Sequence, residues 1–371
     1  MTERKYAMDF RREETAYVLE RWLASQSCAL VGVGSVGKSN LLRHLANAAV
    51  QRHYLGSDLG DNFKAIIVDP NMLTVLNSGA DTHDPSLRAW SGYELLMHRL
   101  FLAFYPFELL SKEDAHRFYD AYDSLQDGNN PLYRLIALRY FEFGLEYLFR
   151  RGARIVFMFD EFEELLKAMP TRFFQNLRGL RDSHKSQLAY LTFTRIPLKD
   201  AAARAGHDYA EIESFIELFT DNTYFVGPYS ETDAERMIAG LSTNSGKHLP
   251  HATSQLLIEI TGGYAGLLRS AFSLIDADAG PGESDTLLEY LCHREPIVTE
   301  CRTIWMSLSD AEQYILRAVA KVSGYDVNAE TQLAINQLVK KRLLRLEKRS
   351  NQLSIHPLIF RRYMQQSRHE P

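Results

Sequence analysis

The chain has 371 residues, with 42 Lys and Arg against 47 Asp and Glu, so its formal net charge of −5 excludes bulk attraction to polyanions. The length allows two or three domains, and the three cysteines are too few and too poorly spaced for a disulfide framework or a metal site. Because no apolar stretch approaches ~18 residues and the N-terminus is charged rather than signal-like, the sequence indicates a cytoplasmic protein.

The N-terminal region contains two helical and two strand-like patterns. Apolar residues recur at helical spacing from Phe10 to Leu23, and the continuous apolar run Cys28–Val31 is typical of a buried strand. Helical spacing returns over residues 41–46, and the run Phe63–Val68 predicts a second buried strand. A glycine-rich segment separates the first strand from the helix that follows it.

That segment, residues 32–39, reads Gly-Val-Gly-Ser-Val-Gly-Lys-Ser and fits the phosphate-binding pattern GxxxxGK[ST]. A glycine turn between a strand and a helix directs several backbone N–H groups to one point, at the positive end of the helix dipole. In this pattern Lys38 reaches the β- and γ-phosphates and Ser39 holds Mg²⁺. An unliganded glycine turn is the alternative. The predicted nucleotide contacts are Gly32, Gly34, Ser35, Val36, Gly37, Lys38, Ser39 and Asn40.

Three more strands are expected in the middle of the chain. After a loop predicted over residues 71–90, helical stretches are expected over 91–105, 112–124, 131–151 and 171–184. The further predicted strands are Arg154–Phe159, Leu188–Thr194 and residues 222–226. Strands that alternate with helices predict an α/β fold with a parallel sheet covered on both faces. Ligands of such sheets bind at the carboxyl ends of the strands.

Charged residues stand at two of these strand ends. Asp160 and Glu161 end the third strand, so Asp160 can hold Mg²⁺ and Glu161 can orient or deprotonate the attacking water. Arg195 ends the fourth strand and can sense the γ-phosphate. Arg178 and Arg181 could act in trans on a neighbouring subunit, although a solvated helix face is the simpler interpretation of these two arginines.

After Gly227-Pro228 the pattern becomes helical. The predicted helices are residues 231–241, 251–261, 266–277, 284–293, 296–307, 311–322 and 330–345. A strand–turn–strand segment over residues 344–355 and a closing helix over 357–366 follow. Helices combined with a small β-ribbon predict a winged helix-turn-helix at the C-terminus.

This order of features resembles the STAND class of signal-transducing NTPases within the wider AAA+ group, and in particular its bacterial AAA-like ATPases. Besides the phosphate loop and the Asp-Glu strand, the segments that carry the resemblance are Phe159–Phe162, Phe173–Arg178, Thr261–Tyr264 and Glu300–Trp305. The resemblance implies a P-loop NTPase domain over residues 1–227, a helical lid over 228–300 and a winged-helix domain over 301–371.

The resemblance also implies roles for three further residues. Arg12 lies where the family has a Gly-Arg-x-x-Glu motif near the nucleotide, although the glycine is missing here. Gly263 belongs to the segment that matches a glycine–proline motif near the base, with Ala265 in place of the proline; a glycine break between helices is the alternative. His356 matches a winged-helix histidine that contacts the bound diphosphate in relatives, or else it is simply a helix-start histidine.

The expected function is that of a slow ATPase switch that binds ATP, ADP and Mg²⁺. Exchange of ADP for ATP would open the lid and the winged helix, and the output would be a protein partner or a homo-oligomer. The first alternative is a DNA-binding AAA+ regulator or initiator-like ATPase, because a run of basic residues follows Val339. The second is a nucleotide-stabilised scaffold without hydrolysis, against which the intact Lys38, Ser39, Asp160 and Glu161 count.

Overall fold

The computed structural model describes residues 6–56, 62–73, 84–127, 130–275, 284–321, 323–347 and 352–366. The chain folds as two compact units. The first comprises Met1–Leu30 and Leu41–Tyr224, and the second comprises Val31–Asn40 and Phe225–Pro371. The phosphate loop therefore belongs to the same unit as the C-terminal helices. The three-domain division expected from the sequence stays a prediction.

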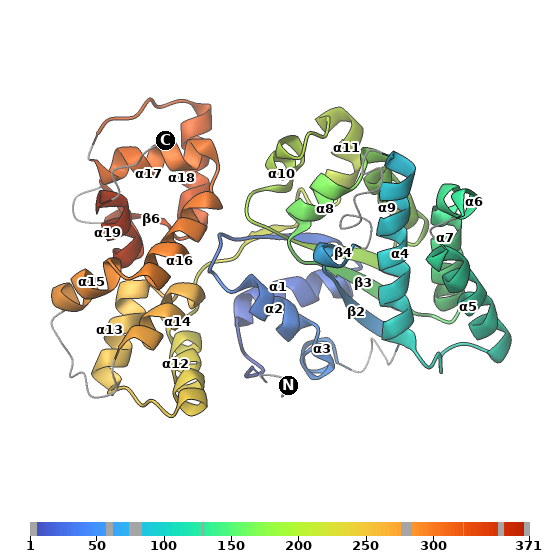
Figure 1. The fold of residues 1–371 in the computed structure, drawn as a ribbon, viewed down its shortest axis with the longest axis horizontal. Helices are drawn as coiled ribbons and strands as arrows, with labels where there is room; N and C mark the ends of the chain where they lie inside the picture. Colours follow the sequence, from blue (N-terminus) through green and yellow to red (C-terminus); the bar gives the residue numbers. More distant parts are fainter. Residues whose placement is uncertain are drawn as a thin grey trace. The chain divides into compact units, whose positions relative to one another are not determined.

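A five-stranded sheet with the order β2-β3-β4-β1-β5 organises the α/β part (Figure 1). Its strands are β1 (Cys28–Val31), β2 (Phe63–Val68), β3 (Arg154–Phe159), β4 (Leu188–Thr194) and β5 (Thr223–Phe225). The pairs β2–β3 and β3–β4 are parallel. Every residue of β4 is buried, as a strand covered on both faces requires. The predicted strands and the predicted α/β fold class are confirmed.

The helices of the first unit differ from the prediction mainly where short helices replace loops. They are α1 (Arg12–Leu23), α2 (Lys38–Leu45, which begins in the phosphate loop), α3 (Ala48–Leu55), α4 (Pro85–Phe104), α5 (Lys112–Gln126), α6 (Pro131–Leu135), α7 (Ala137–Phe149), α8 (Phe162–Ala168), α9 (Thr171–Ser183), α10 (Leu198–Arg204) and α11 (Tyr209–Ile216), with a 3-10 turn η1 at Pro70–Met72. The loop predicted over 71–90 is wrong at its end, because the Asp84 side chain accepts a hydrogen bond from Ser86 N (2.8 Å) and starts α4 at Pro85. Residues 74–83 of that loop lie outside the described part of the chain.

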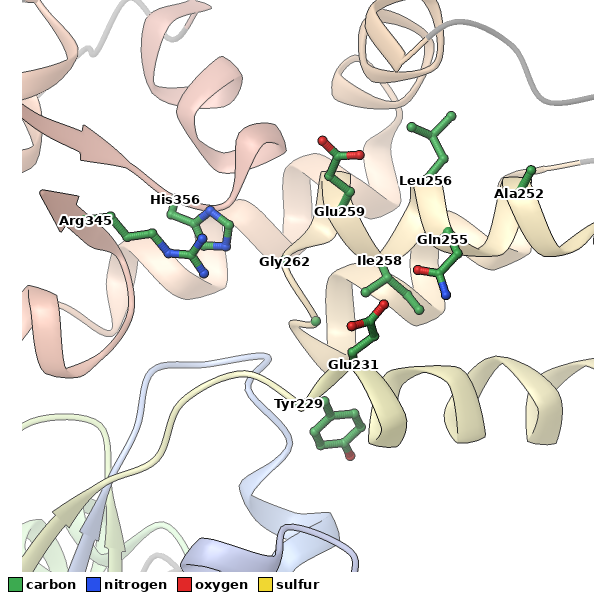
Figure 2. A pocket seen from close by; sticks show the side chains of 11 residues that line it. Tyr229, Glu231, Ala252, Gln255, Leu256, Ile258, Glu259, Gly262, Arg345 and His356 are labelled. Carbon is green, nitrogen blue, oxygen red and sulfur yellow. The ribbon is translucent and has the colours of Figure 1, made fainter. Parts of the chain in front are cut away.

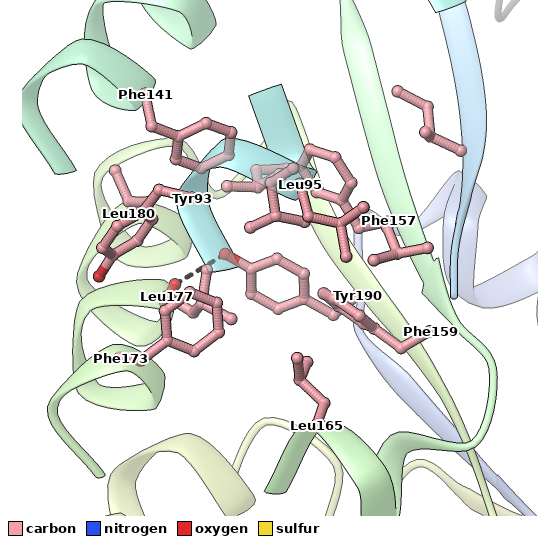
Figure 3. Close-up of a cluster of buried hydrophobic side chains, with 14 of the residues drawn as sticks. Tyr93, Leu95, Phe141, Phe157, Phe159, Leu165, Phe173, Leu177, Leu180 and Tyr190 are labelled. Atoms are coloured by element: carbon pink, nitrogen blue, oxygen red, sulfur yellow. Dashed lines mark hydrogen bonds between the residues drawn. The ribbon is translucent and has the colours of Figure 1, made fainter. Parts of the chain in front are cut away.

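An aromatic core packs between the sheet and α4, α8 and α9 (Figure 3). Tyr190 of β4 is fully buried, and its hydroxyl donates to the carbonyl oxygen of Leu177 in α9 at 2.8 Å. Burial raises the pKa of Tyr190 well above its ordinary value, so the phenol stays protonated and can donate this hydrogen bond. This core fixes β3 and β4, and so the positions of the residues at their carboxyl ends.

From Glu231 onward, the described residues of the second unit form helices and one hairpin. Its helices are α12 (Glu231–Ser245), α13 (His251–Thr261), α14 (Ala265–Leu274), α15 (Ser284–Cys292), α16 (Glu295–Met306), α17 (Asp310–Ala320), α18 (Ala329–Lys340) and α19 (Leu358–Gln366). The antiparallel strands β6 (Leu344–Glu347) and β7 (Gln352–Ile355) form the hairpin. The helix predicted up to Arg345 is wrong at its end, because the chain leaves the helix after Lys340 and β6 begins at Leu344. Residues 348–351, the predicted turn, lie outside the described residues.

One residue of the predicted basic run points inward. The Lys341 ammonium group is fully buried and contacts both carboxylate oxygens of Glu312, at 2.6 and 2.8 Å. A buried lysine of this kind must be paired, since an isolated charge is costly in the interior. Lys341 therefore belongs to the core formed by α17 and α18 and not to a basic surface.

Within the described residues, no helix is both long enough and apolar enough to cross a membrane.

Candidate nucleotide site

The phosphate loop connects β1 to α2 and has the backbone that its glycines allow. Gly37 has φ +94°, and a Cβ atom there would come within 2.9 Å of the Tyr229 hydroxyl, so only glycine fits. Ser35 also adopts a positive φ (+63°). Val36 is fully buried, so the loop is fixed to the interior at this residue. The helix then begins at Lys38, which places this lysine and Ser39 at its positive end.

The Lys38 side chain folds back over its own loop. Its ammonium group donates to the carbonyl oxygens of Gly32 and Val33, the latter at 3.1 Å. Ser39 is exposed. The lysine ammonium group thus lies next to the first two residues of the loop, and the exposed serine follows one residue further on.

Helices α14 and α16 also contact the loop. The Gly266 amide donates to Ser35 O at 2.9 Å, and the Ser35 hydroxyl donates to the Glu300 carboxylate. The Gly34 amide donates to Ser307 Oγ at 3.1 Å. Sequence reasoning missed the contacts of Glu300 and Ser307. The only available signal is their spacing, since positions 300, 303 and 307 lie on one helix face.

Tyr229 was also missed, and it joins the loop to the predicted Gly262-Gly263 turn. Asn40 Nδ2 donates to the Tyr229 hydroxyl at 2.7 Å, and Tyr229 N donates to Gly263 O at 2.9 Å. Gly263 has φ +77°, and a Cβ atom there would lie 2.6 Å from Tyr229 O. The glycine is thus required by close backbone packing as well as by conformation.

A pocket of about 650 Å³ lies between α13 and the β6–β7 hairpin (Figure 2). Its walls combine Tyr229, the Gly262-Gly263 turn and the α13 face with Arg345 and His356, whose side chains lie next to each other in Figure 2. The structure therefore brings together two of the predicted nucleotide contacts, Gly263 and His356, in one pocket.

His356 is held in a confined environment. Its Nε2 atom is buried and has no hydrogen-bond partner among the described residues, and a Cβ atom at Gly262 would come within 2.5 Å of it. Burial, together with the charges of Arg345 and Arg361, lowers the pKa of His356 from 6.5 to about 4. The imidazole is therefore neutral at pH 7.

This shift predicts a pH effect on stability. Between pH 6.5 and about 4 the unfolded chain binds a proton at His356 and the folded chain does not, so the free energy of unfolding falls as the pH is lowered through this window. We expect His356→Gln, which cannot titrate, to lose less stability than the wild type between pH 7 and pH 5. Urea unfolding at both pH values measures this, and equal losses in the two proteins would contradict it.

Asp160 and Glu161, which are predicted to hold Mg²⁺ and to activate water, lie in the first unit directly after β3. The Asp160 amide donates to Val68 O at 3.1 Å, which keeps Asp160 in register with β2. Glu161 has φ +42°, uncommon for a residue other than glycine, and turns its carboxylate toward Arg195 Nη2 at 3.1 Å. Asn71 Nδ2 contacts the other carboxylate oxygen at 3.4 Å. Glu161 and Arg195, chosen from separate strand ends, thus form one pair.

The remaining predicted arginines lie elsewhere in the first unit. Arg12 is exposed at the start of α1, whereas its neighbour Arg11 is buried and pairs with Glu14 at 2.7 Å. Arg178 bonds to Asp182 (2.7 Å), and Arg181 donates to the carbonyl oxygen of Ser25. Arg178 and Arg181 are thus engaged within their own chain.

The donor atoms suit the cofactors expected from the sequence. Mg²⁺ prefers oxygen ligands, and the exposed Ser39 residue of the loop carries a hydroxyl oxygen. The loop offers amide groups and an ammonium group, the donors that a polyphosphate needs.

Comparison with solved structures finds similar folds along almost the whole chain. A Walker-type ATPase of Pyrococcus abyssi matches with a TM-score of 0.50 and 17% identity, covering 96% of this chain and 95% of the other. ORC2 of Aeropyrum pernix, in ADPNP and ADP complexes, matches with a TM-score of 0.46 and 13% identity, covering 96% of this chain and 93% of the other. Cdc6p of Pyrobaculum aerophilum matches with a TM-score of 0.41 and 11% identity, covering 98% of this chain and 96% of the other. Scans against protein-family models and curated proteins found no match. The sheet order and the match to the first structure together show that this chain has the α/β fold of that Walker-type ATPase.

Proposed function

We propose that the protein is an ATPase switch that binds ATP and ADP with Mg²⁺ at the phosphate loop. The observation that carries the proposal is the loop itself, in which Gly37 has a positive φ, the Lys38 ammonium group folds back onto the loop and Ser39 is exposed at the start of α2. The fold shared with a Walker-type ATPase supports it. The Glu161–Arg195 pair at the carboxyl edge of the sheet supports hydrolysis over binding alone.

Each residue has a defined role in this proposal. The loop amides and Lys38 hold the phosphates, and Ser39 and Asp160 hold the metal, which would neutralise charge on the phosphates. Glu161 orients or deprotonates the attacking water, and Arg195 stabilises charge that develops on the γ-phosphate. From the resemblance, Gly263 and His356 contact the base and the diphosphate of ADP, and Arg12 contacts the nucleotide from α1.

The output proposed first is STAND-type assembly, in which ATP and ADP stabilise different states of the protein. Its support is that Gly263 and His356 share one pocket in the C-terminal unit. Light scattering with ADP and with a non-hydrolysable ATP analogue tests this output. A mass that changes between the two nucleotides is expected, and identical masses would exclude nucleotide-gated self-assembly.

The second candidate is an initiator-like ATPase that binds DNA. Of the three structures named above, one is an ORC2 protein and one is a Cdc6 protein. The support that this chain offers is an exposed basic group at the junction of α18 and β6, formed by Lys340, Arg342 and Arg345. Lys348, Arg349 and Arg368, which were part of the predicted basic segment, lie outside the described residues.

A gel shift with duplex DNA at several salt concentrations separates the two outputs. DNA binding would give a shift that weakens with salt and that Arg345→Ala reduces, because each phosphate contact releases counterions. The absence of a shift at low salt, with ATP or with ADP, would eliminate the initiator-like candidate.

A further inference from the structure

Helix α16 contacts the phosphate loop through Glu300 and Thr303, together with Ser307, the residue that follows the helix. The Ser35 hydroxyl donates to the Glu300 carboxylate, and the Gly34 amide donates to Ser307 Oγ at 3.1 Å. Thr303 packs so closely that a Cβ atom at Gly34 would lie 2.5 Å from its Cγ2 atom. The loop and α16 belong to the same compact unit, so these contacts are internal to it.

The contacts use the same kinds of loop group that a polyphosphate needs. A phosphate-binding loop holds anions with backbone amides at the positive end of a helix. Here one such amide, that of Gly34, is bound to a serine that is only 3% exposed. The neighbouring Ser35 hydroxyl donates to the carboxylate of Glu300, a group of the same charge sign as a phosphate. The Ser307 hydroxyl donates in turn to Ile304 O at 2.6 Å, which directs its lone pairs at the loop.

We propose that Glu300 and Ser307 form an internal clasp on the phosphate loop. The clasp occupies loop groups that a nucleotide needs, so its contacts must break before a nucleotide can bind. The inference rests on the proposed nucleotide site and adds its regulation. Gly266 N, from α14, holds Ser35 O at 2.9 Å, so release of the loop also frees a contact to α14. Binding of phosphate is thereby coupled to the positions of α14 and α16. A partner that moves α16 away from the phosphate loop would raise the affinity of the loop for nucleotide.

The test compares nucleotide affinity in matched variants. Glu300→Gln keeps the size of the side chain and a hydrogen-bond acceptor for Ser35 but removes the competing charge. We expect it to bind ADP and ATP about tenfold more tightly than the wild type, since hydrogen bonds to charged groups are about twice as strong as neutral ones. Ser307→Ala is expected to act in the same direction. Glu295→Gln, on the exposed first turn of the same helix, is the control and leaves the affinity unchanged.

A second measurement separates this inference from the proposed function. Hydrogen exchange of the loop amides without nucleotide should be faster in Glu300→Gln than in the wild type, because the clasp is weakened. Unchanged affinity together with unchanged exchange would overturn the clasp. Failure of the wild type and of every variant to bind nucleotide would overturn the proposed function. In that case the hydrogen-exchange rates of the loop amides would still test the clasp by themselves.

Discussion

Replacing Lys38 by Ala is expected to abolish nucleotide binding. The ammonium group now contacts the carbonyl oxygens of Gly32 and Val33, and in this motif the lysine reaches the β- and γ-phosphates. Hydrogen bonds from a charged group contribute about 1.5–3 kcal/mol each, so the loss of two corresponds to at least ~100-fold weaker binding. Calorimetric titration with Mg²⁺ and ATP measures the change.

Lys112→Ala is the matched control for this variant. Lys112 is exposed at the first position of α5, and its removal should leave nucleotide affinity at the wild-type level. Circular dichroism of both variants confirms that they are folded. Wild-type affinity in a folded Lys38→Ala protein would remove the phosphate loop from the proposed function.

Replacing Glu161 by Gln is expected to keep ATP bound while stopping its hydrolysis. The glutamine side chain has the same shape, and its carbonyl oxygen can still accept the hydrogen bond from Arg195, now 3.1 Å from the carboxylate. It cannot take up a proton from water. Because a general base contributes about 10²–10⁴-fold to a rate, we expect turnover to fall by at least ~100-fold with little change in the affinity for ATP. Phosphate release measures the first and calorimetry the second.

The control for this variant lies three residues further along. Glu164 pairs with Lys167 on the surface of α8 at 2.8 Å, so Glu164→Gln changes the same charge without removing a predicted base. It should hydrolyse ATP like the wild type. Normal turnover in Glu161→Gln would exclude Glu161 as the base.

The strands and the phosphate loop could be predicted because their signals are local. The runs that became β3 and β4 are continuous, apolar and too short for helices, and a strand covered on both faces leaves this pattern in the sequence. Helices α8 and α10 have only 7 residues each, about two turns, which is too little for a helical period to stand out.

Contacts between distant segments could not be predicted in the same way. Ser35 and Glu300 are 265 positions apart, and Gly34 and Ser307 are 273 apart, so no local pattern indicates that they meet. The burial of Lys341 could not be predicted from the sequence either. In the sequence it belongs to a basic run, but its side chain turns inward to Glu312, because the helix ends at Lys340 and the next residue faces the core.

The central claim is that this loop grips a nucleotide polyphosphate with the help of magnesium, and calorimetric titration of ATP tests it most directly. The account predicts saturable heat with Mg²⁺ in the wild type, stronger binding in Glu300→Gln and none in Lys38→Ala. Titrations without any saturable heat, in Glu300→Gln as well as in the wild type, would contradict it.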